Sequence, residues 1–320
     1  MSRRGPRVFA GCGGAGLAAA VGVAATAFLV GVFECRGAWA FDAEVRMAAS
    51  VAALESFHSR QLAIHVVAGN PAVFILDFPE LEQQGRMFSR ILALIERQGG
   101  EREHVLTDTQ LEGLMTASGK GFATYAYGND FRSVDLAKFY TIASDEKIDL
   151  NNDEIGLRDF LIAKGVMERK FEFYTPVPPE RVIISIPQSG GGSVAVRKKS
   201  GQAAITPQLR KAILHHEISH GEYYTNPAYS EYCRDFWARG LTESERAAFR
   251  KFLAGKGYDP ENGDLMINET QAYLIHTPSH DVFSPAMVGL TVGEVEGLVS
   301  RFWAGAPPSR FFQKERSRSP

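Results

Sequence analysis

The residues best suited to chemistry lie in the segment His-Glu-Ile-Ser-His at positions 216–220. On an α-helix, where each residue turns by about 100°, His216 and His220 lie one turn apart and about 40° around the axis. Two imidazoles on one helix face can bind a single tetrahedral zinc ion. Glu217 lies beside them and can reach a water molecule on the metal without binding the metal itself. The segment therefore predicts a zinc site with an adjacent general base.

The helix that carries this segment has clear start and stop signals. Thr206 is suited to the N-cap and Pro207 to the first helical position, and Gly221 is expected to end the helix. The same spacing also arises by chance, so two structural histidines on a half-buried helix are the alternative. The caps and the intervening apolar residues favour the metal site. The apolar residues on the face that leads to His216 are Leu209, Ala212 and Ile213.

A zinc site needs a third protein ligand and an open position for water. A second helix is expected over residues 264–276, with Asp264 as its cap. Glu269, Ala272 and Tyr273 share one face of it, and the small Ala272 allows close approach to the first helix. We predict Glu269 as the third ligand and Tyr273 as a catalytic residue. The alternatives that remain open for the third ligand are Glu231, His276, His280 and Asp281.

A hydrogen-bond donor is also needed to stabilise the oxyanion that forms when a carbonyl is attacked. Tyr273 is the candidate on the second helix, and His276 and His280 follow it in the chain. Tyr223 and Tyr224 come just after the histidine segment, where plain core packing explains them equally well. The sequence leaves the choice among these donors open.

The two motifs together resemble a known family. His-Glu-x-x-His at 216–220 followed by Asn-Glu-x-x-Ala at 268–272 is similar to the gluzincin branch of the zinc metallopeptidases. The metzincin pattern is excluded, because it requires Gly and His where this chain has Tyr223 and Asn226. The resemblance covers about residues 206–280, with 48 residues between His220 and Glu269, more than in thermolysin-like members. It implies His216, His220 and Glu269 as zinc ligands, Glu217 as catalytic base, and hydrolysis of a peptide or protein substrate.

Two other functions fit the same residues. One is a non-catalytic exported protein with a metal site, which acts on cell-envelope partners through residues 41–190. The presence of Glu217 argues against it, because a structural site has no need of a base. The other is a zinc amidase that cleaves a cell-wall amide. A cleft lined by a strand edge would favour an extended peptide, whereas a closed pocket would favour a small amide.

The first 40 residues have the features of a secretory signal peptide. Three arginines precede residue 8, no charged residue occurs over Val8–Phe33, and Ala38–Ala40 provides a small-x-small cleavage sequence. The sequence therefore predicts a periplasmic or secreted protein. The apolar run is long for a signal peptide, so a retained membrane anchor is the alternative. Cleavage would leave Cys233 as the one cysteine, and thus no internal disulfide.

Composition and charge limit the classes of protein. The chain has 320 residues, 45% of them hydrophobic, which suffices for a substantial core. Its formal net charge of −2 argues against a nucleic-acid partner. We expect a mainly helical α+β fold with a zincin-like catalytic half, in which a short sheet packs on the histidine helix. The expected division is an N-terminal α/β domain of unknown role over 41–190, the metallohydrolase domain over 191–308, and a disordered tail over 309–320.

Periodicity and capping signals predict the remaining elements. The stretch 149–153 lacks the glycine and glutamate of a calcium loop, so we interpret it as a helix cap. A strand over 194–197, just before the histidine helix, would bind an extended substrate if the family resemblance holds. Helices are expected over 41–65, 80–97, 132–143 and 152–163 and after Thr107, Thr242 and Thr291, and strands over 72–76 and 181–187.

Overall fold

The computed structural model describes residues 44–48, 50–96, 103–190 and 205–312. They belong to one compact unit that runs from Trp39 to Pro320. The predicted signal peptide, the predicted strand over 194–197 and the last eight residues lie outside the described residues. In the described part of the chain, no helix is both long enough and apolar enough to cross a membrane.

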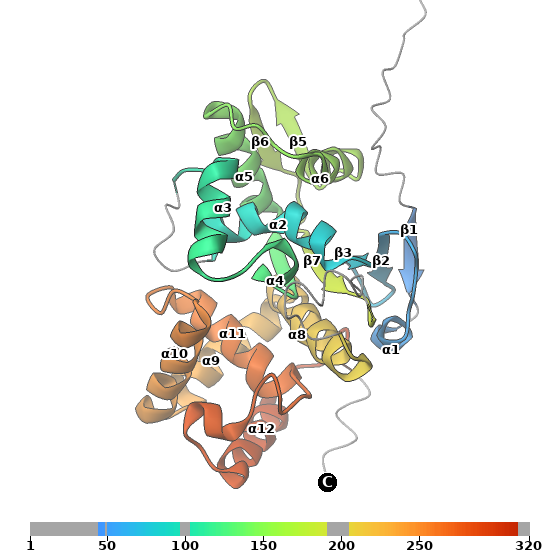
Figure 1. The fold of residues 1–320 in the computed structure, drawn as a ribbon. Coiled ribbons are helices and arrows are strands. Elements are labelled where there is room, and N and C mark those ends of the chain that lie inside the picture. The colour runs from blue at the N-terminus through green and yellow to red at the C-terminus, as the bar shows by residue number, and fades with distance from the viewer. Residues whose placement is uncertain (1–43, 49, 97–102, 191–204, 313–320) are drawn as a thin grey trace, which may run out of the picture. The chain divides into compact units, whose positions relative to one another are not determined.

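A mixed five-stranded sheet forms the centre of this unit, in the order β1-β2-β3-β7-β4 (Figure 1). β1 pairs with β2 and β3 with β7 in parallel, whereas β2 pairs with β3 and β4 with β7 antiparallel. The strands predicted over 72–76 and 181–187 are confirmed as β3 and β7. A separate hairpin is formed by β5 and β6. The strands are β1 (Val45–Ala48), β2 (Ala63–Val67), β3 (Asn70–Phe78), β4 (Asn129–Arg132), β5 (Met167–Lys170), β6 (Phe173–Pro176) and β7 (Val182–Pro187).

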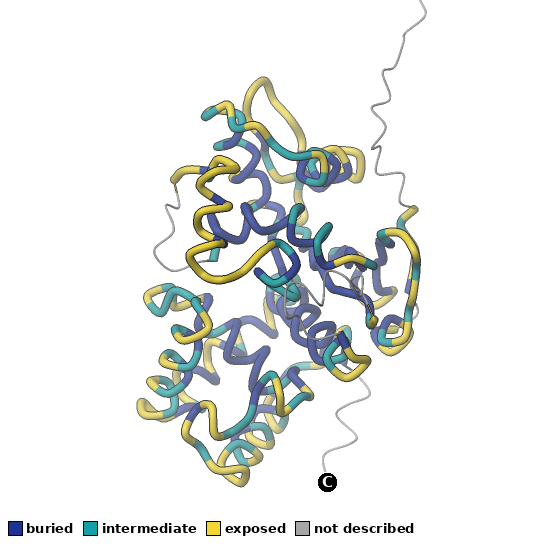
Figure 2. The backbone as a smooth tube through the Cα atoms, viewed as in Figure 1, coloured by how far each residue is buried: buried dark blue, intermediate teal, exposed yellow. Residues whose placement is uncertain are grey.

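The central strands are buried on both faces, because side chains alternate along a strand and helices cover each side. On one face, Phe74 and Leu76 pack against the helices α2, α5 and α6. On the other, Val73 and Ile75 pack against Ile218 of α8. Figure 2 shows the resulting buried layer in the strands and in much of α8. The helices of the first half are α1 (Val51–Glu55), α2 (Leu81–Ile95), α3 (Asp108–Ala117), α4 (Phe122–Tyr125), α5 (Ser133–Asp145) and α6 (Asn152–Ala163).

The regular elements described after residue 205 are all helices, joined by loops. The core of this second half joins α8 to the later helices around Tyr229, Phe249 and Phe302. The predicted capping boxes at Thr107, Thr242 and Thr291 are confirmed, as is the helix cap at Asn151. The fold is therefore α+β and mainly helical, with a small mixed sheet. The elements are α8 (Pro207–Thr225), α9 (Pro227–Asp235), the π-helix η1 (Phe236–Gly240), α10 (Glu243–Lys256), α11 (Gly263–His276), the 3₁₀ helix η2 (Pro285–Val288) and α12 (Val292–Gly305).

Two predictions about the first half are wrong. The helix expected over 41–65 is limited to the five residues of α1, which Ser50 caps. The flanking residues instead form β1 and β2, because the same apolar side chains are buried by pairing within the sheet. The boundary expected near residue 190 lies inside one compact unit, since the sheet of the first half packs directly on α8.

Two predicted helix ends and the predicted start of the disordered tail also differ from the structure. α8 continues past Gly221 to Thr225. Gly221 serves packing: a Cβ there would lie 3.0 Å from the Val73 side chain. The N-cap of α11 is Asn262, not Asp264. At the other end of the chain, Phe312 is buried and stacks on His276 with 4.2 Å between ring centroids, so the predicted disorder does not hold for residues 309–312.

The link between α8 and the sheet includes a buried ion pair. Arg210 of α8 binds both carboxylate oxygens of Asp77 on β3, at 2.9 and 2.7 Å. It also donates to the backbone oxygens of Leu54, Glu55 and Pro187, and its side chain is fully buried. Every donor of the guanidinium is thereby used.

Replacing Arg210 with alanine is expected to lower the free energy of unfolding by about 3–5 kcal/mol, because it leaves the Asp77 carboxylate buried without its partner. Urea denaturation of the variant measures this loss. Arg86 provides the control, since its ion pair with Asp153 is partly exposed and its replacement should cost no more than about 1 kcal/mol. Equal effects of the two substitutions would contradict the assigned role of Arg210.

Candidate metal centre

The middle of α8 buries polar side chains, which is unusual for a helix. His216, Glu217 and His220 are each no more than 7% exposed. The helix lies against the sheet on one side and against α11 on the other, and Ala272, fully buried, lies on the α11 side of that contact. The predicted close approach of the two helices is therefore confirmed. Such buried polar groups need partners, and those partners come from α11 and β4.

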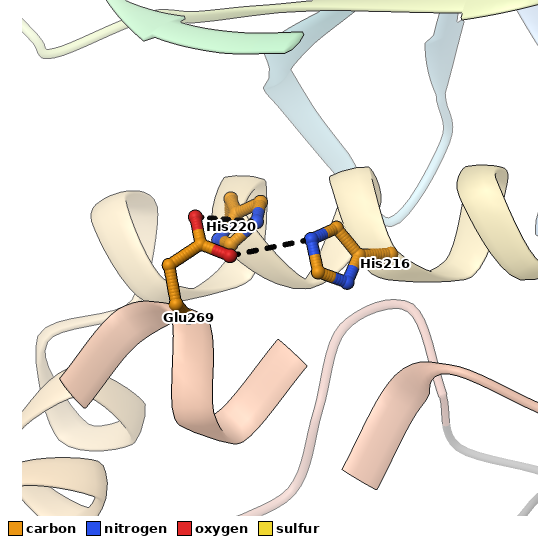
Figure 3. Close-up of side chains that lie close together, drawn as sticks. All are labelled: His216, His220 and Glu269. Carbon is orange, nitrogen blue, oxygen red and sulfur yellow. Dashed lines mark ion pairs between the residues drawn. The ribbon is translucent and has the colours of Figure 1, made fainter. Parts of the chain in front are cut away.

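The two predicted histidines and the predicted glutamate converge (Figure 3). His216 Nε2 lies 3.5 Å from one carboxylate oxygen of Glu269, and His220 Nε2 lies 3.6 Å from the other. Ligand atoms of all three residues lie within 4.8 Å of one another. Ligands at the usual zinc distances of 2.0–2.1 Å in a tetrahedron are about 3.3 Å apart. The three side chains are thus close to the spacing that a bound zinc ion requires.

The hydrogen bond of His216 Nδ1 shows which ring nitrogen can bind a metal. The Thr277 hydroxyl donates to the carbonyl of Ala272 at 2.9 Å, so its oxygen accepts the proton of His216 Nδ1, 3.0 Å away. Burial lowers the pKa of His216, which keeps the ring neutral and leaves a lone pair on Nε2. That lone pair faces Glu269 Oε2, a buried oxygen without a hydrogen-bond partner. Two acceptors face each other, and a cation between them would satisfy both.

The charges around the site also favour a cation. Burial raises the pKa of Glu217 well above its usual range, and the nearby carboxylates of Asp130 and Glu269 raise it further. Burial likewise raises the pKa of Asp130 to about 6. Burial acts in the same direction on Glu269, but the imidazoles of His220 and His216 outweigh it and lower the pKa of this carboxyl. Three acidic groups surrounding two histidines form a donor set suited to a divalent ion.

Glu217 lies against the backbone that leads into β4. A Cβ added at Gly128 would lie 2.1 Å from Glu217 Oε1, closer than atoms can approach. Glycine is therefore needed at this position if the carboxylate is to keep its place. The first half of the chain thus shapes the surroundings of the predicted base.

Two cavities adjoin the centre. The larger, of about 490 Å³, is lined by His216, Glu217 and Tyr273, together with the three apolar residues predicted on the same face of α8. The Tyr273 ring lies 4.5 Å from that of His216. The smaller cavity, of about 260 Å³, is lined by Asp130, by Arg132 and by parts of α2, α5 and α11.

The other predicted candidates do not join the three converging ligands, although Asp281 lines the larger cavity and Tyr224 lines the smaller one. His276 is hydrogen-bonded to Tyr229 Oη at 2.8 Å, and Glu231, His280 and Asp281 are exposed. Among the described residues, none of these four belongs to a group that could hold a metal. Tyr223 donates to Asp264 and packs in the second core, while the Arg132 guanidinium lies over the ring of Tyr224. His215 faces away, toward Glu55, as expected from its position on the helix.

Sequence reasoning missed four residues around the centre. Gly128 and Asp130 belong to the run Tyr-Gly-Asn-Asp at 127–130. The glycine and the acidic residue are the only features of this run that could have indicated a functional site. Thr277 follows the end of α11. Tyr258 follows Gly257, the left-handed residue that ends α10, and the Tyr258 side chain lines the larger cavity. No spacing rule connects these positions to the histidine helix, because the fold alone brings them there.

Comparisons with known proteins leave the chain without an assigned family. No protein-family model, no curated protein and no solved structure matches it. The function must therefore be argued from the residues of the site.

Proposed function

We propose that the protein is a zinc-dependent hydrolase, and specifically a metallopeptidase. The observation that carries the proposal is the convergence of His216, His220 and Glu269, with the lone pair of His216 Nε2 aimed at an unpartnered carboxylate oxygen. A donor set of two histidines and one glutamate is typical of catalytic zinc sites, which keep one position open. The adjoining cavity of about 490 Å³ has the size of a substrate site.

A zinc ion in this site would supply a Lewis acid and would lower the pKa of a water molecule toward neutrality. The chain's own residues perform the proton transfers. Glu217, whose carboxylate borders the larger cavity, accepts a proton from the reacting water. It then passes that proton to the nitrogen of the leaving amine. Tyr273 lines the same cavity and is the predicted donor to the oxyanion.

The arrangement around β4 favours an extended peptide over a small amide. β4 is the last strand of the described sheet, so one edge of it has no neighbour within that sheet. Residues 127 and 128, just before β4, line the larger cavity, and Asp130 and Arg132 in the strand line the smaller one. A chain running along β4 would therefore extend from one cavity to the other past the candidate metal centre. Main-chain pairing with an edge strand is a common way to bind extended peptides.

Metal content and cleavage of a mixed peptide library test the proposal. The purified protein is expected to hold about one zinc per chain, to cleave peptides, and to lose both zinc and activity to a chelator. Restoring zinc should restore cleavage. Zinc binding without cleavage of any peptide, but with cleavage of a cell-wall amide, would support the amidase instead. Failure to bind zinc when it is supplied would overturn the metallohydrolase and favour the non-catalytic alternative.

A further inference from the structure

Two buried carboxylates next to the candidate metal centre lack hydrogen-bond donors. Asp130 is 9% exposed and Glu217 is 7% exposed. Among the described residues, neither carboxylate accepts a hydrogen bond, and Asp130 Oδ1 lies 3.7 Å from His220 Nε2. A buried carboxylate is costly unless donors satisfy it. Glu217 lines the larger cavity and Asp130 lines the smaller one, so water can reach both carboxylates and donate to them.

The distances identify the kind of group. Ligand atoms of Asp130, Glu217 and His220 lie within 4.8 Å of one another. When two oxygens accept the two protons of one water molecule at 2.7–2.8 Å, they are about 4.4 Å apart. The spacing is therefore compatible with one water molecule that donates one hydrogen bond to each carboxylate. His220 Nε2 adjoins this position and also points at Glu269, so the water would lie beside the metal centre.

We propose that Asp130 is the second acceptor of the reacting water, opposite Glu217. This inference rests on the proposed hydrolase function and adds a catalytic residue from the first half of the chain. Each carboxylate holds one proton of the water, and this fixes the orientation of its oxygen toward the substrate carbonyl. Two constraints on a water molecule define its orientation, whereas Glu217 alone would leave it free to rotate.

The proton balance gives the two carboxylates different roles. As the water oxygen bonds to the carbonyl carbon, Glu217 accepts one proton, and the other stays on that oxygen, held by Asp130. When the carbon–nitrogen bond breaks, Glu217 passes its proton to the amine. The second proton leaves with the new carboxylic acid and is released to solvent. Asp130 therefore begins and ends the cycle in the same state, as a residue that orients the water.

Asp130 is distinct from the proposed zinc ligands. His216, His220 and Glu269 form one group with metal-ligand spacing, whereas Asp130 belongs with Glu217 and His220 to a second such group. We assign the zinc to the first group, because it supplies two histidines and one glutamate. The position of Asp130 is set by β4, which pairs with β7 through this residue opposite Ile184. Because the strand fixes the backbone, the carboxylate is held over the site without taking part in zinc binding.

The test compares Asp130→Asn and Asp130→Ala with the wild type in the full chain. Both variants should keep about one zinc and the wild-type unfolding temperature. Their kcat should fall by about 10- to 100-fold, more in the alanine variant, with KM little changed. A second measurement follows azide binding to the cobalt(II)-loaded protein by visible absorption. Azide should bind about fivefold more tightly or better, because a negative charge and a bond to the displaced water are both lost.

Asp135→Asn is the matched control, since Asp135 pairs with Arg132 and is not the proposed water acceptor; it should change azide affinity less than either Asp130 substitution does. Wild-type kcat and azide affinity in both Asp130 variants would overturn the inference while leaving the hydrolase intact. Loss of zinc from either folded variant would also overturn it, because Asp130 would then be a ligand. Failure of the wild type to bind zinc or to cleave any substrate would instead contradict the proposed function.

Discussion

Replacing Glu217 with glutamine is expected to lower kcat by about 10³-fold while zinc content stays near one per chain. The expected loss lies within the range of 10²- to 10⁴-fold for removal of a general acid–base group. Glutamine keeps the size of the side chain, which must fit against Gly128, but cannot accept the proton of the reacting water. Peptide hydrolysis and metal analysis on the same preparation measure both parts of the result.

Glu222→Gln is a fitting control for this experiment. Glu222 lies on the same helix and is fully buried, but it is hydrogen-bonded to Asn226 and to the backbone of Arg310. Its substitution should leave kcat and zinc content unchanged. Wild-type activity in Glu217→Gln would mean that another group acts as base. Loss of zinc from that variant would make Glu217 a ligand, and the proposed site would need a different arrangement.

Replacing Glu269 with alanine is expected to weaken zinc binding by at least about 100-fold, beyond what loss of an outer-shell partner costs. The variant removes both oxygens that face His216 and His220, and a site with two ligands cannot close around zinc. Competition with a chromogenic chelator measures the affinity directly. The loss of bound zinc should also lower the unfolding temperature when the two proteins are compared at equal zinc concentration.

Glu231→Ala serves as the control for the third ligand, since Glu231 is exposed on α9 and was one of the alternatives left open by the sequence. It should bind zinc as the wild type does. If Glu269→Ala also keeps its zinc, the third ligand must be sought elsewhere, and Asp130, which adjoins His220, becomes the first candidate. If Glu269→Ala keeps its zinc and Asp130 proves to be the ligand, both the assignment of Glu269 and the water-orienting role of Asp130 are contradicted.

Local signals in the sequence were sufficient to predict most helices and the two central strands. Thr206 and Pro207 begin α8 where capping preferences place its start, and the boxes at Thr242 and Thr291 begin α10 and α12. The histidine pair and Glu269 were also predictable, because helical spacing puts each on a definite face. Whether the two faces would meet depended on tertiary packing, and the structure brings them together.

Features that depend on pairing between distant segments were not predictable. The residues over 45–67 have apolar spacing compatible with a helix, yet both ends of this stretch form strands, because β2 pairs with β3 and β1 pairs with β2. Local signals predict a helix end at Gly221. In the structure the helix continues, and the missing side chain lets the side chains of Val73 and Ile184 pack against the helix at this point. Asp130 lies 90 residues before His220 in the chain, and only the pairing of β4 with β7 brings the two together. Local periodicity contains no information about such contacts.

The sheet behind α8 has a consequence for how the chain can be divided. The apolar face of α8, which carries Ile213, Leu214 and Ile218, is covered by strands from the first half. A fragment that began near residue 191 would present this face to solvent and would be prone to self-association. The candidate ligands lie on α8 and α11, and α8 packs on the sheet, so a ligand that binds the centre would stabilise the whole unit by mass action. The candidate site is in this sense not a transferable module, and a fusion or a truncation must keep both halves of the chain.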